Sequence, residues 1–487
     1  MDPRHITALS AILGDDARVL TQPQVVERLS RDFYWYSPVL RSQLDGKVAD
    51  VVAQPITASE VQSVLRYCHV NDLPVTARGA GTGNYGQAVP LHGGVVLDLA
   101  RMDRIESIQP DGVAVCEPGV RLGVLETEAR KLGWELRCYP STIVKASLGG
   151  FLGGGSGGIG SVAHGGLRDF STVRALEVVT MEANPRIVRH DGEAIHDILH
   201  AWGTNGVITR IWLALTPAIE WSQCVVAFDH FDSAFDFSER IATDHAWTKR
   251  LVTTFEWPIP SFFAPVRQYA PHGKALSFFL IASAQLAQLE AELQQIDATK
   301  NGATITYSAP YHGLRTLPLL SDYTWNHTTL WALKTDPAWT YLQCGFDPAT
   351  VRDQFRKLKD RFPNEILFHI EFMKNGAGQV IPGSIPLVYY STEARLNEII
   401  DFCRASGVFV ANPHVNNVEG GGRYRPDNVQ LLAKHRYDPK GLLNPGKMIT
   451  FKPEAAVTEA AKEAVMPIKK EAPAQTPTPA TETVPTP

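Results

Sequence analysis

The chain has 487 residues, enough for two or three domains, and its content of 44% hydrophobic and 20% charged residues is ordinary for a folded protein. The formal net charge is -5, and no dense run of Lys or Arg is present to neutralise a nucleic-acid backbone, so we expect no nucleic-acid partner. The six cysteines are scattered without a C-x-x-C pair, which indicates buried thiols in a reducing compartment.

The amino-terminal stretch MDPRHITALSAILGDDARVL carries acidic residues and has no long apolar core, so it does not resemble a secretory signal. We expect residues 1–44 to form a helical lead-in. The most apolar later run, ALSFFLIASAQLA from Ala275, is too short to span a bilayer. These features predict a cytoplasmic protein without a membrane span.

Residues 45–217 alternate between short strand-like runs, helical patterns and glycine-rich turns, and we interpret them as the first domain. Within TASEVQSVLRYCHVNDLP, Thr57 and Glu60 have the pattern of a helix-capping box, and Pro74 lies beyond the end of that helix. Two later stretches, GGVVLDLARM and GVAVCEPGV, predict strands, and RLGVLETEARKLGWEL predicts a helix that ends near Gly133.

Longer strand-and-helix units follow the sequence TPAIEW. Examples are QCVVAFDHF with DSAFDFSERIATDH, and KALSFFLIAS with AQLAQLEAELQQID, which predict a second α+β domain over residues 218–410. Residues 411–450 are rich in turn signals, and we expect this segment to return to the first domain. Residues 451–487 contain mainly Pro, Ala, Thr, Glu and Lys, so we predict a disordered tail.

The stretch TARGAGTGNYG contains a G-x-G-x-x-G pattern at Gly81, Gly83 and Gly86, after the strand-like run LPVTAR. A dinucleotide-binding Rossmann turn needs this pattern to open a helix. Here the chain continues into QAVPLHGGVVLDL, where Pro90 and a β-branched run disfavour a helix. Binding of NAD is therefore an alternative that we do not favour, and a simple turn between strands is a second alternative.

A second glycine-rich stretch, SLGGFLGGGSGGIGSVAHGG from Ser147 to Gly166, holds far more glycine than one turn requires. Glycine at this density lets the backbone approach a ligand closely. Two such loops in one domain indicate backbone N–H groups that hold a large anionic cofactor. A third stretch, GLLNPGKM, has the spacing of a phosphate-binding P-loop, but Met448 stands where a hydroxyl must meet magnesium and Pro445 lacks an N–H.

Four stretches, taken in order, resemble the FAD-linked oxidase superfamily, which includes vanillyl-alcohol oxidase, para-cresol methylhydroxylase and the glycolate and D-lactate dehydrogenases. They are PVTARGAGTGNYGQAVP, YPSTIVKASLGGFLGGGSGG, WGTNGVITRIWLALTP and DPKGLLNPGKMI. The resemblance covers residues 45–217 and 438–449. It implies an α+β protein with the two-subdomain, PCMH-type FAD-binding fold of the vanillyl-alcohol oxidase kind and an α+β cap domain with an antiparallel sheet.

The resemblance also implies which residues surround the flavin. The first glycine loop would lie around the diphosphate of FAD, and the second would lie near the flavin. The backbone about Gly206 would meet the cofactor, and the C-terminal segment would return to it. The implied cofactor-binding residues are Arg78, Gly79, Ala80, Gly81, Thr82, Gly83, Asn84, Pro140, Ser141, Ser147, Gly149, Gly150, Gly153, Gly154, Gly206, Val207, Ile208, Asn444 and Lys447.

Some members of the superfamily bond the flavin covalently through a histidine in the first loop or a cysteine in the second. This sequence has Thr82 and Ile143 at those places, which implies non-covalent FAD. The hydroxy-acid dehydrogenases often carry an H-x-G-D-G-N-x-H metal motif and a G-E-H-G segment. Here FHIEFMKNG and NNVEGGGR replace them, with Glu419 matched but Gly420 in place of the histidine, so we predict no metal.

Oxidation of an alcohol by a flavin needs a base for the leaving proton, and a histidine suits this role. His414, in NPHVNN, is one candidate, and the alternative is a loop histidine that caps local turns. His327, in DYTWNHTTLWALK, is a second candidate. Its neighbours Tyr323, Trp325 and Trp331 either form an aromatic wall above a planar group or belong to the core.

His369 and Glu371 alternate in LFHIEFM and should point to the same face of a strand. They form either a base or metal pair, or a polar face whose hydrogen bonds are satisfied within the sheet. Arg423, with Arg425 in GGGRYRPDN, is a candidate clamp for a substrate carboxylate, and the alternative is a surface arginine near a turn.

We interpret the chain as a cytoplasmic flavoprotein dehydrogenase, an FAD-dependent oxidoreductase that oxidises a small alcohol or a glycolate-like or lactate-like 2-hydroxy acid by hydride transfer to flavin N5. Its partners would be this small substrate and an electron acceptor, namely oxygen, a quinone or a protein. One alternative is a non-catalytic FAD-binding subunit of a larger dehydrogenase complex. The other is an NAD-dependent dehydrogenase.

Overall fold

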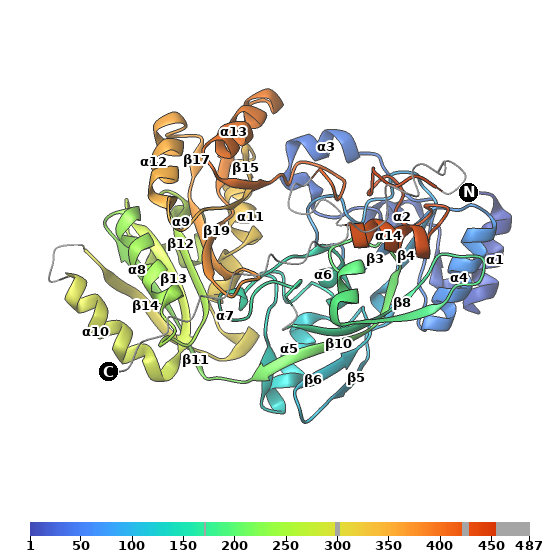
Figure 1. Cartoon of the computed structure of the whole chain (residues 1–487), viewed down its shortest axis with the longest axis horizontal. Helices are drawn as coiled ribbons and strands as arrows, with labels where there is room; N and C mark the ends of the chain where they lie inside the picture. The colour runs from blue at the N-terminus through green and yellow to red at the C-terminus, as the bar shows by residue number, and fades with distance from the viewer. Residues whose placement is uncertain (170–171, 298–301, 421–427, 454–487) are drawn as a thin grey trace, which may run out of the picture.

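The structure is a computed structural model that describes residues 1–169, 172–297, 302–420 and 428–453, and it has two lobes side by side (Figure 1). The first lobe holds the N-terminal helices, the strands as far as β10 (Val207–Pro217) and the helix α14 (Asn428–Tyr437). The second lobe holds the elements from β11 (Trp221–Phe228) to β21 (Phe409–Ala411). The predicted tail lies outside the described residues from residue 454 onward.

The first lobe begins with three helices and a four-stranded sheet in the order β1-β2-β4-β3. The strands β2 and β3 both pair in parallel with β4, because the helix α4 (Ala58–Val70) returns the chain to the same end of the sheet. The predicted cap of this helix is confirmed, since the hydroxyl of Thr57 accepts a hydrogen bond from the backbone N–H of Glu60 at 3.1 Å. The elements are α1 (Pro3–Leu13), α2 (Pro23–Leu29), α3 (Pro38–Leu44), β1 (Val19–Leu20), β2 (Val51–Ala53), β3 (Val75–Arg78) and β4 (Val95–Asp98).

The second sheet of the first lobe is antiparallel and has the order β5-β6-β10-β8-β9, with β7 paired to the end of β10. Leu122, Leu125 and Ala129 on one face of the helix α5 are buried in the core that this sheet shares. The elements are β5 (Ile105–Ile108), β6 (Val113–Cys116), α5 (Leu122–Lys131), β7 (Trp134–Leu136), α6 (Leu148–Gly154), α7 (Ser161–His164), β8 (Val173–Val179) and β9 (Ile187–Asp191).

The second lobe contains an eight-stranded sheet in the order β14-β11-β13-β12-β18-β19-β16-β21, and every neighbouring pair is antiparallel. This confirms the predicted α+β class with an antiparallel sheet. A three-stranded sheet, β15-β20-β17, lies beside it. The strands are β12 (Lys249–Phe255), β13 (Ala275–Ala282), β14 (Thr304–Tyr311), β15 (Trp339–Tyr341), β16 (Gln343–Gly345), β17 (Ile366–Leu367), β18 (His369–Lys374), β19 (Val380–Ser384) and β20 (Leu387–Tyr389). The helices are α8 (Phe231–Thr243), α9 (Ile259–Phe262), α10 (Leu286–Asp297), α11 (Asn326–Thr335), α12 (Val351–Arg361) and α13 (Glu393–Ala405).

The most apolar run of the sequence forms the central strand β13, and both faces of this strand are buried. Phe279 and Ile281 pack into the core that the sheet shares with α8, α10, α12 and α13, whereas Leu276 and Phe278 pack into the core on the other face. A strand that is covered on both faces needs apolar residues at every position. No helix in the described part of the chain is long and apolar enough to cross a membrane.

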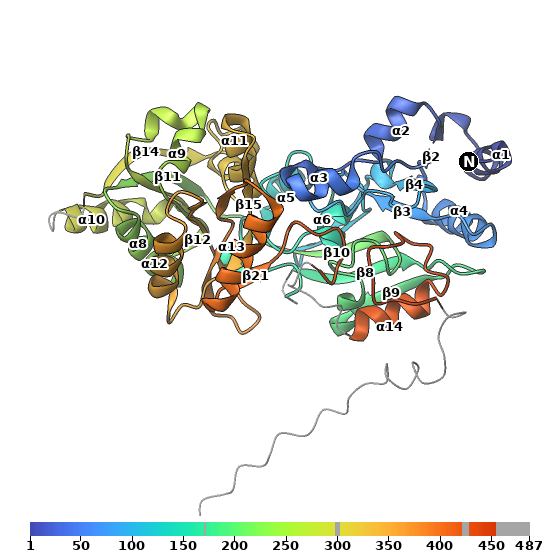
Figure 2. The same ribbon diagram turned by 90° about the horizontal axis from the view of Figure 1, so that it is seen from above.

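The C-terminal segment packs on the first lobe, where α14 lies beside β9 (Figure 2). The backbone N–H of Val75 in β3 donates to the carbonyl oxygen of Leu442 at 2.8 Å, and the N–H of Asn444 donates to the carbonyl oxygen of Val75 at 2.7 Å. Lys434 of α14 is buried and donates to the carboxylate of Asp438 at 2.5 Å. These bonds place the last described segment directly behind the first glycine loop.

One buried arginine joins the two lobes. Arg250 on β12 forms ion pairs with Glu126 of α5 at 3.1 Å and with Glu135 of β7 at 3.4 Å, and all three side chains are at most 3% exposed. Its guanidinium also donates to the carbonyl oxygen of Leu136 at 2.9 Å and lies 4.7 Å from the ring centre of Tyr139. The central sheet of the second lobe is therefore attached to the core of the first.

We expect the substitution Arg250→Met to lower the free energy of unfolding by about 3 kcal/mol, because Glu126 and Glu135 lose their fully buried arginine and keep only the partly exposed Arg130. Arg356→Met is the matched control. Its ion pair with Asp353 is largely exposed, so its loss should change the free energy of unfolding far less than the loss of Arg250. Urea unfolding followed by tryptophan fluorescence measures both values, and equal losses would contradict the role of Arg250.

Candidate functional site

A cavity of about 690 Å³ lies where the two lobes meet. Its volume falls in the range of roughly 300–1,000 Å³ that is typical of small-molecule and cofactor sites. The first lobe lines it with residues 77–85, at the end of β3 and after it, and with residues of and around α6. The second lobe lines it with the start of α11 and with parts of β16, β18 and β19.

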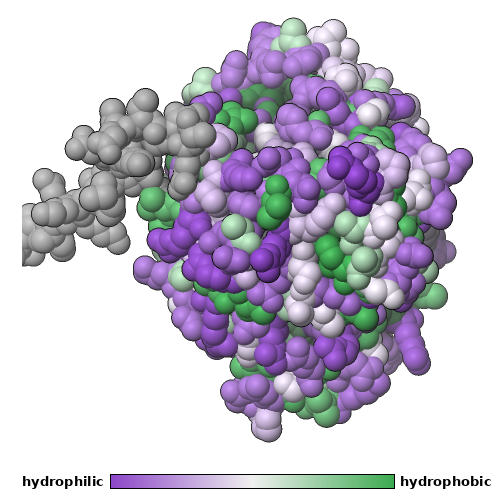
Figure 3. All heavy atoms as spheres, turned by 90° about the vertical axis from the view of Figure 1, so that its right-hand side faces the viewer, coloured by the Kyte–Doolittle hydropathy of each residue, from purple (hydrophilic) through white to green (hydrophobic). Residues whose placement is uncertain are grey.

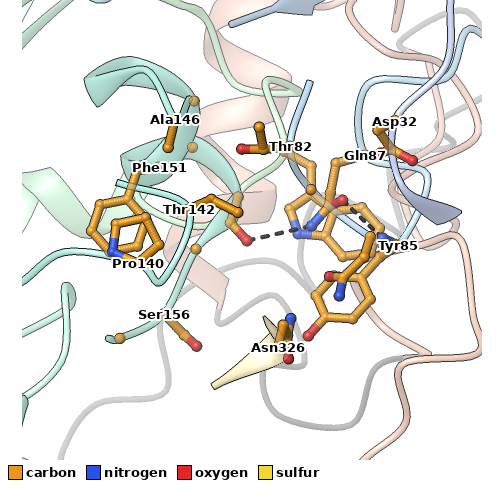
Figure 4. Close-up of a pocket in the computed structure, with 18 of the residues that line it drawn as sticks. Asp32, Thr82, Tyr85, Gln87, Pro140, Thr142, Ala146, Phe151, Ser156 and Asn326 are labelled. Atoms are coloured by element: carbon orange, nitrogen blue, oxygen red, sulfur yellow. Dashed lines mark hydrogen bonds between the residues drawn. The ribbon is translucent and has the colours of Figure 1, made fainter. Parts of the chain in front are cut away.

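The first glycine loop forms one side of the cavity. The chain leaves β3 at Arg78 and forms no helix before β4 begins at Val95, so the G-x-G-x-x-G pattern does not open a helix. Gly81 has a φ of +65°, a left-handed conformation that glycine adopts without strain. Figure 4 shows Thr82, Tyr85 and Gln87 of this segment on the side of the pocket opposite Pro140, Thr142 and Phe151.

The two predicted glycine loops are in direct contact. The hydroxyl of Ser147, at the start of α6, accepts a hydrogen bond from the backbone N–H of Ala80 at 3.0 Å. A Cβ atom added at Gly79 would lie only 2.2 Å from that hydroxyl oxygen and 3.1 Å from the Cα of Gly150. At Gly153 an added Cβ would meet no atom within 4 Å, because this residue faces open space in the cavity.

Charged groups are buried beside the first loop. Asp32, which lines the cavity, accepts hydrogen bonds from the backbone N–H groups of Tyr34 at 3.0 Å and Ala88 at 3.3 Å, and burial raises its pKa to about 6. Burial lowers the pKa of Lys447 to about 7, and its ammonium group has no hydrogen-bond partner among the described residues. Arg78 donates to the carbonyl oxygen of Arg31 at 2.6 Å.

The second lobe contributes His327 to the cavity wall. Its Nδ1 lies 3.2 Å from the carbonyl oxygen of Asp322, which can only accept, so Nδ1 carries the proton and Nε2 keeps its lone pair. Burial lowers the pKa of His327 to about 4, so the ring is neutral at pH 7. Trp325, two residues earlier, has a φ of +50°, a strained conformation that often marks a functional site.

Glu371 also lines the cavity, from β18. Its Oε1 accepts hydrogen bonds from the backbone N–H of Trp325 at 2.7 Å and from Nε2 of His369 at 2.8 Å. The predicted placement of His369 and Glu371 on one face of a strand is therefore observed, with Glu371 at the cavity and His369 behind it. No group of three or more His, Cys, Asp or Glu side chains suited to a metal occurs within the described ranges.

His414 lies outside the residues that line the cavity. Its Nδ1 accepts a hydrogen bond from the hydroxyl of Ser37 at 2.7 Å, and its Nε2 donates to the carbonyl oxygen of Tyr341 at 2.9 Å. Both ring nitrogens are thus engaged, and burial lowers its pKa to about 4. This placement does not suit the expected role as a base, because the two ring nitrogens join Ser37 of the lead-in segment to Tyr341 of β15.

The other predicted residues fall into three groups. Those of the two glycine loops line the cavity, as do Gly206 and Ile208. Val207, Asn444 and Lys447 do not line it, and the side-chain amide of Asn444 instead supports the wall from behind by donating to the carbonyl oxygens of Gln87 and Trp202 at 2.8 and 2.7 Å. Arg423 and Arg425 lie outside the described residues.

Comparison with known proteins agrees with this geometry. Residues 49–189 match a family described as FAD binding domain. The chain is 32% identical over 430 residues to the D-lactate dehydrogenase of Archaeoglobus fulgidus, and the match covers 82% of this chain and 91% of that relative. This chain belongs to the FAD-linked oxidases. It is also 26% identical over 264 residues to the glycolate oxidase subunit GlcD of Bacillus subtilis, covering 51% of this chain and 54% of that one.

The fold of this FAD-linked oxidase is shared with a solved structure of alkyldihydroxyacetonephosphate synthase. The TM-score is 0.68 at 17% sequence identity, and the superposition covers 92% of this chain and 85% of the other. The similarity therefore extends over both lobes, and the predicted membership in the FAD-linked oxidase superfamily is confirmed. The chain is an FAD-linked oxidoreductase related to 2-hydroxy-acid dehydrogenases.

The residues around the cavity fit FAD. Two glycine loops offer backbone N–H groups to a diphosphate, and Gly153 leaves space where any larger side chain would intrude. The indole N–H of Trp202, which lines the cavity, has no hydrogen-bond partner among the described residues. A buried donor without a partner is costly, so these groups suit a ligand with many acceptor atoms.

Sequence reasoning missed several residues of the wall. Asp32 lies in the expected helical lead-in, where no motif marks it. Asn326 stands next to His327, and Trp202 lies four residues before Gly206, but neither was selected. In the structure, Trp202 is distinguished by its backbone, since its φ of +55° is uncommon for a bulky residue. A distant segment such as Asp32 joins the site only because the chain folds over it.

We expect the substitution Gly79→Ala to remove most of the bound FAD, because its Cβ overlaps Ser147 and forces the two glycine loops apart. Gly376→Ala is the control. There the nearest atom outside its chain neighbours would be 3.7 Å away, and the residue does not line the cavity. The ratio of flavin to protein absorbance after purification measures retention, and an unchanged ratio in Gly79→Ala would contradict the contact between the loops.

Proposed function

We propose that this FAD-linked oxidase converts a CH–OH group of a small alcohol or 2-hydroxy acid to a carbonyl group, with electrons passed on to oxygen, a quinone or a protein acceptor. FAD, when bound, supplies the hydride acceptor at flavin N5. The observation that carries the proposal is the cavity, which joins both glycine loops to a wall with a neutral histidine. In this arrangement residues 45–217 are the FAD-binding domain and residues 218–410 the substrate-binding cap.

We also propose that FAD is held without a covalent bond. The loop N–H groups would hold the diphosphate, and Lys447 would supply a positive charge behind the first loop, where its ammonium has no hydrogen-bond partner among the described residues. Thr82 lines the cavity, and its hydroxyl is a weak nucleophile. Ile143, in the second loop, has no nucleophilic atom.

The non-covalent state predicts that denaturation releases the flavin. After acid precipitation of the purified holoenzyme, intact FAD should be in the supernatant and the protein pellet should be colourless. Absorbance near 450 nm in both fractions measures this. Yellow colour that stays with the washed pellet would contradict the proposal, and a mass increase on a peptide would identify the residue that is bonded.

His327 is the proposed base. The hydrogen bond from its Nδ1 to the carbonyl oxygen of Asp322 fixes the ring so that Nε2 is the basic nitrogen. This atom takes the hydroxyl proton while the carbon-bound hydrogen leaves as hydride, so the substrate loses two electrons and two hydrogens. Because burial lowers the pKa of His327 to about 4, the neutral ring, which can accept a proton, is present at neutral pH.

We expect His327→Gln to retain FAD but to slow the reduction of the flavin roughly 100-fold to 10,000-fold under anaerobic stopped-flow conditions, because the base is missing. In the wild type the rate constant should fall as the pH drops toward 4, where the base becomes protonated. The parallel variant His414→Ala discriminates between the two histidines. A comparable loss in His414→Ala with little loss in His327→Gln would transfer the role to His414.

A panel of D- and L-2-hydroxy acids, alcohols and sugars identifies the reaction class. Bleaching of the flavin by any of them without oxygen supports CH–OH oxidation. Protein that is yellow but never bleached would contradict it and favour a non-catalytic FAD-binding subunit.

A further inference from the structure

The second-lobe wall of the cavity carries negative charge but no positive charge among the described residues. Glu371 is its charged side chain, and neither Lys nor Arg of this lobe lines the cavity within the described ranges. Most of the wall is apolar, formed by Trp325, Leu330, Met373, Ile381, Ile385 and Phe409. This is an unusual surface for a substrate that carries a carboxylate, since a buried charge needs a partner.

The start of α11 is a positive electrostatic feature of this wall, and Glu371 already occupies it. A helix start is a common place for an anion, because its first N–H groups lack partners within the helix. Here the N–H of Trp325 donates to Glu371 at 2.7 Å, and the N–H of His327 donates to the carbonyl oxygen of Thr324 at 3.1 Å. A substrate anion at this end would therefore meet the carboxylate of Glu371.

Two of the polar groups on this wall offer acceptors, and the indole N–H of Trp325 is a donor that has no hydrogen-bond partner among the described residues. The side-chain oxygen of Asn326, at the edge of the pocket in Figure 4, has no hydrogen-bond partner among the described residues. His327 presents the lone pair of Nε2, because its Nδ1 holds the proton. These acceptors can bind a hydroxyl donor, whereas they repel the oxygens of a substrate carboxylate.

The cations of the cavity lie on the first-lobe side. Arg78 and Lys145 belong to the two glycine loops, and Arg78 is bonded to the carbonyl oxygen of Arg31 beside Asp32. These positive charges are suited to the diphosphate of FAD. The second-lobe wall therefore has no lysine or arginine among the described residues to pair with a substrate anion.

We propose that the substrate is a neutral alcohol with an apolar body, and that Glu371 excludes 2-hydroxy acids from the second-lobe wall. This inference rests on the proposed oxidation of a CH–OH group and narrows its substrate class. The hydroxyl group donates its hydrogen to Nε2 of His327, and the apolar body packs against the side chains around Ile385 and Phe409. The D-lactate dehydrogenase relative acts, by its name, on an acid, so the prediction separates this chain from that relative.

The test compares acids with amides of the same shape. Mandelate and mandelamide, and lactate and lactamide, carry the same CH–OH group and differ mainly in charge. Each enantiomer is mixed anaerobically with the purified holoenzyme, and the second-order rate constant for flavin bleaching is measured. We expect the amides to exceed the matching acids by about tenfold or more, because the acid faces a like charge.

The outcomes separate this inference from the proposed function. An acid that reduces the flavin as fast as its amide, or faster, overturns the exclusion and leaves CH–OH oxidation intact. If neither compound reduces the flavin, the proposed function fails for this class, and titration of the flavin absorbance spectrum decides about binding. Tighter binding of the amide then supports the exclusion, whereas tighter or equal binding of the acid, or no binding of either amide, overturns it.

Two sets of variants assign the cause. Glu371→Gln keeps an acceptor for the N–H of Trp325 and removes the charge, so it should raise acid binding relative to amide binding by about tenfold. The control Glu256→Gln changes a carboxyl group elsewhere in this lobe that does not line the cavity, and it should leave the ratio unchanged. A ratio that is the same in Glu371→Gln and wild type contradicts the role of Glu371.

Arg423 and Arg425 lie outside the described residues, so the double variant Arg423→Met, Arg425→Met is measured with the same compounds. If the wild type prefers acids and this variant loses that preference, an arginine supplies the missing cation and the proposal is overturned. If the amides remain the better reductants of flavin in both proteins, the proposal is supported.

Discussion

The rest of the structure depends on the buried ion pairs of Arg250. This residue lies on β12 and is held by Glu126 and Glu135 of the first lobe. Its carbonyl oxygen accepts a hydrogen bond from the N–H of Gly160, within the second glycine-rich stretch, at 2.8 Å. Three residues along β12, Thr253 pairs with Glu371 of β18. At about 3.4 Å per residue, the anchor lies roughly 10 Å along the strand from the residue opposite Glu371.

The strand β12 thus connects the ion pairs of Arg250 to the cavity wall. Glu371 accepts from the N–H of Trp325, and α11 begins at the next residue, so the helix start and His327 follow the position of β18. The glycine loops lie on the other side, where the N–H of Ala80 donates a hydrogen bond to the hydroxyl of Ser147. A cofactor between them would therefore face His327 and Glu371, on elements that are connected to the first lobe through Arg250.

Local patterns in the sequence predicted much of the fold. The strand β13 and the helix α10 both form where the sequence predicted a strand and a helix. A strand that is buried on both faces has apolar residues at every position, whereas a helix that is buried on one face has them at helical spacing. The glycine loops were identified from composition and from the missing helix after Gly86, and both line the cavity. Asp32 and Trp202 were missed because nothing in their local sequence distinguishes a cavity residue from any other.

The two candidate histidines show where local sequence stops being informative. Both stand near turn or aromatic signals, yet His327 lines the cavity and His414 uses both ring nitrogens to join Ser37 with Tyr341. The sequence by itself determined the two glycine-rich loops that line the cavity, because glycine spacing and strand patterning are local properties. Only the tertiary structure decided which side chains line that cavity and which charges they meet, because contacts between residues hundreds of positions apart arise only when the lobes pack together.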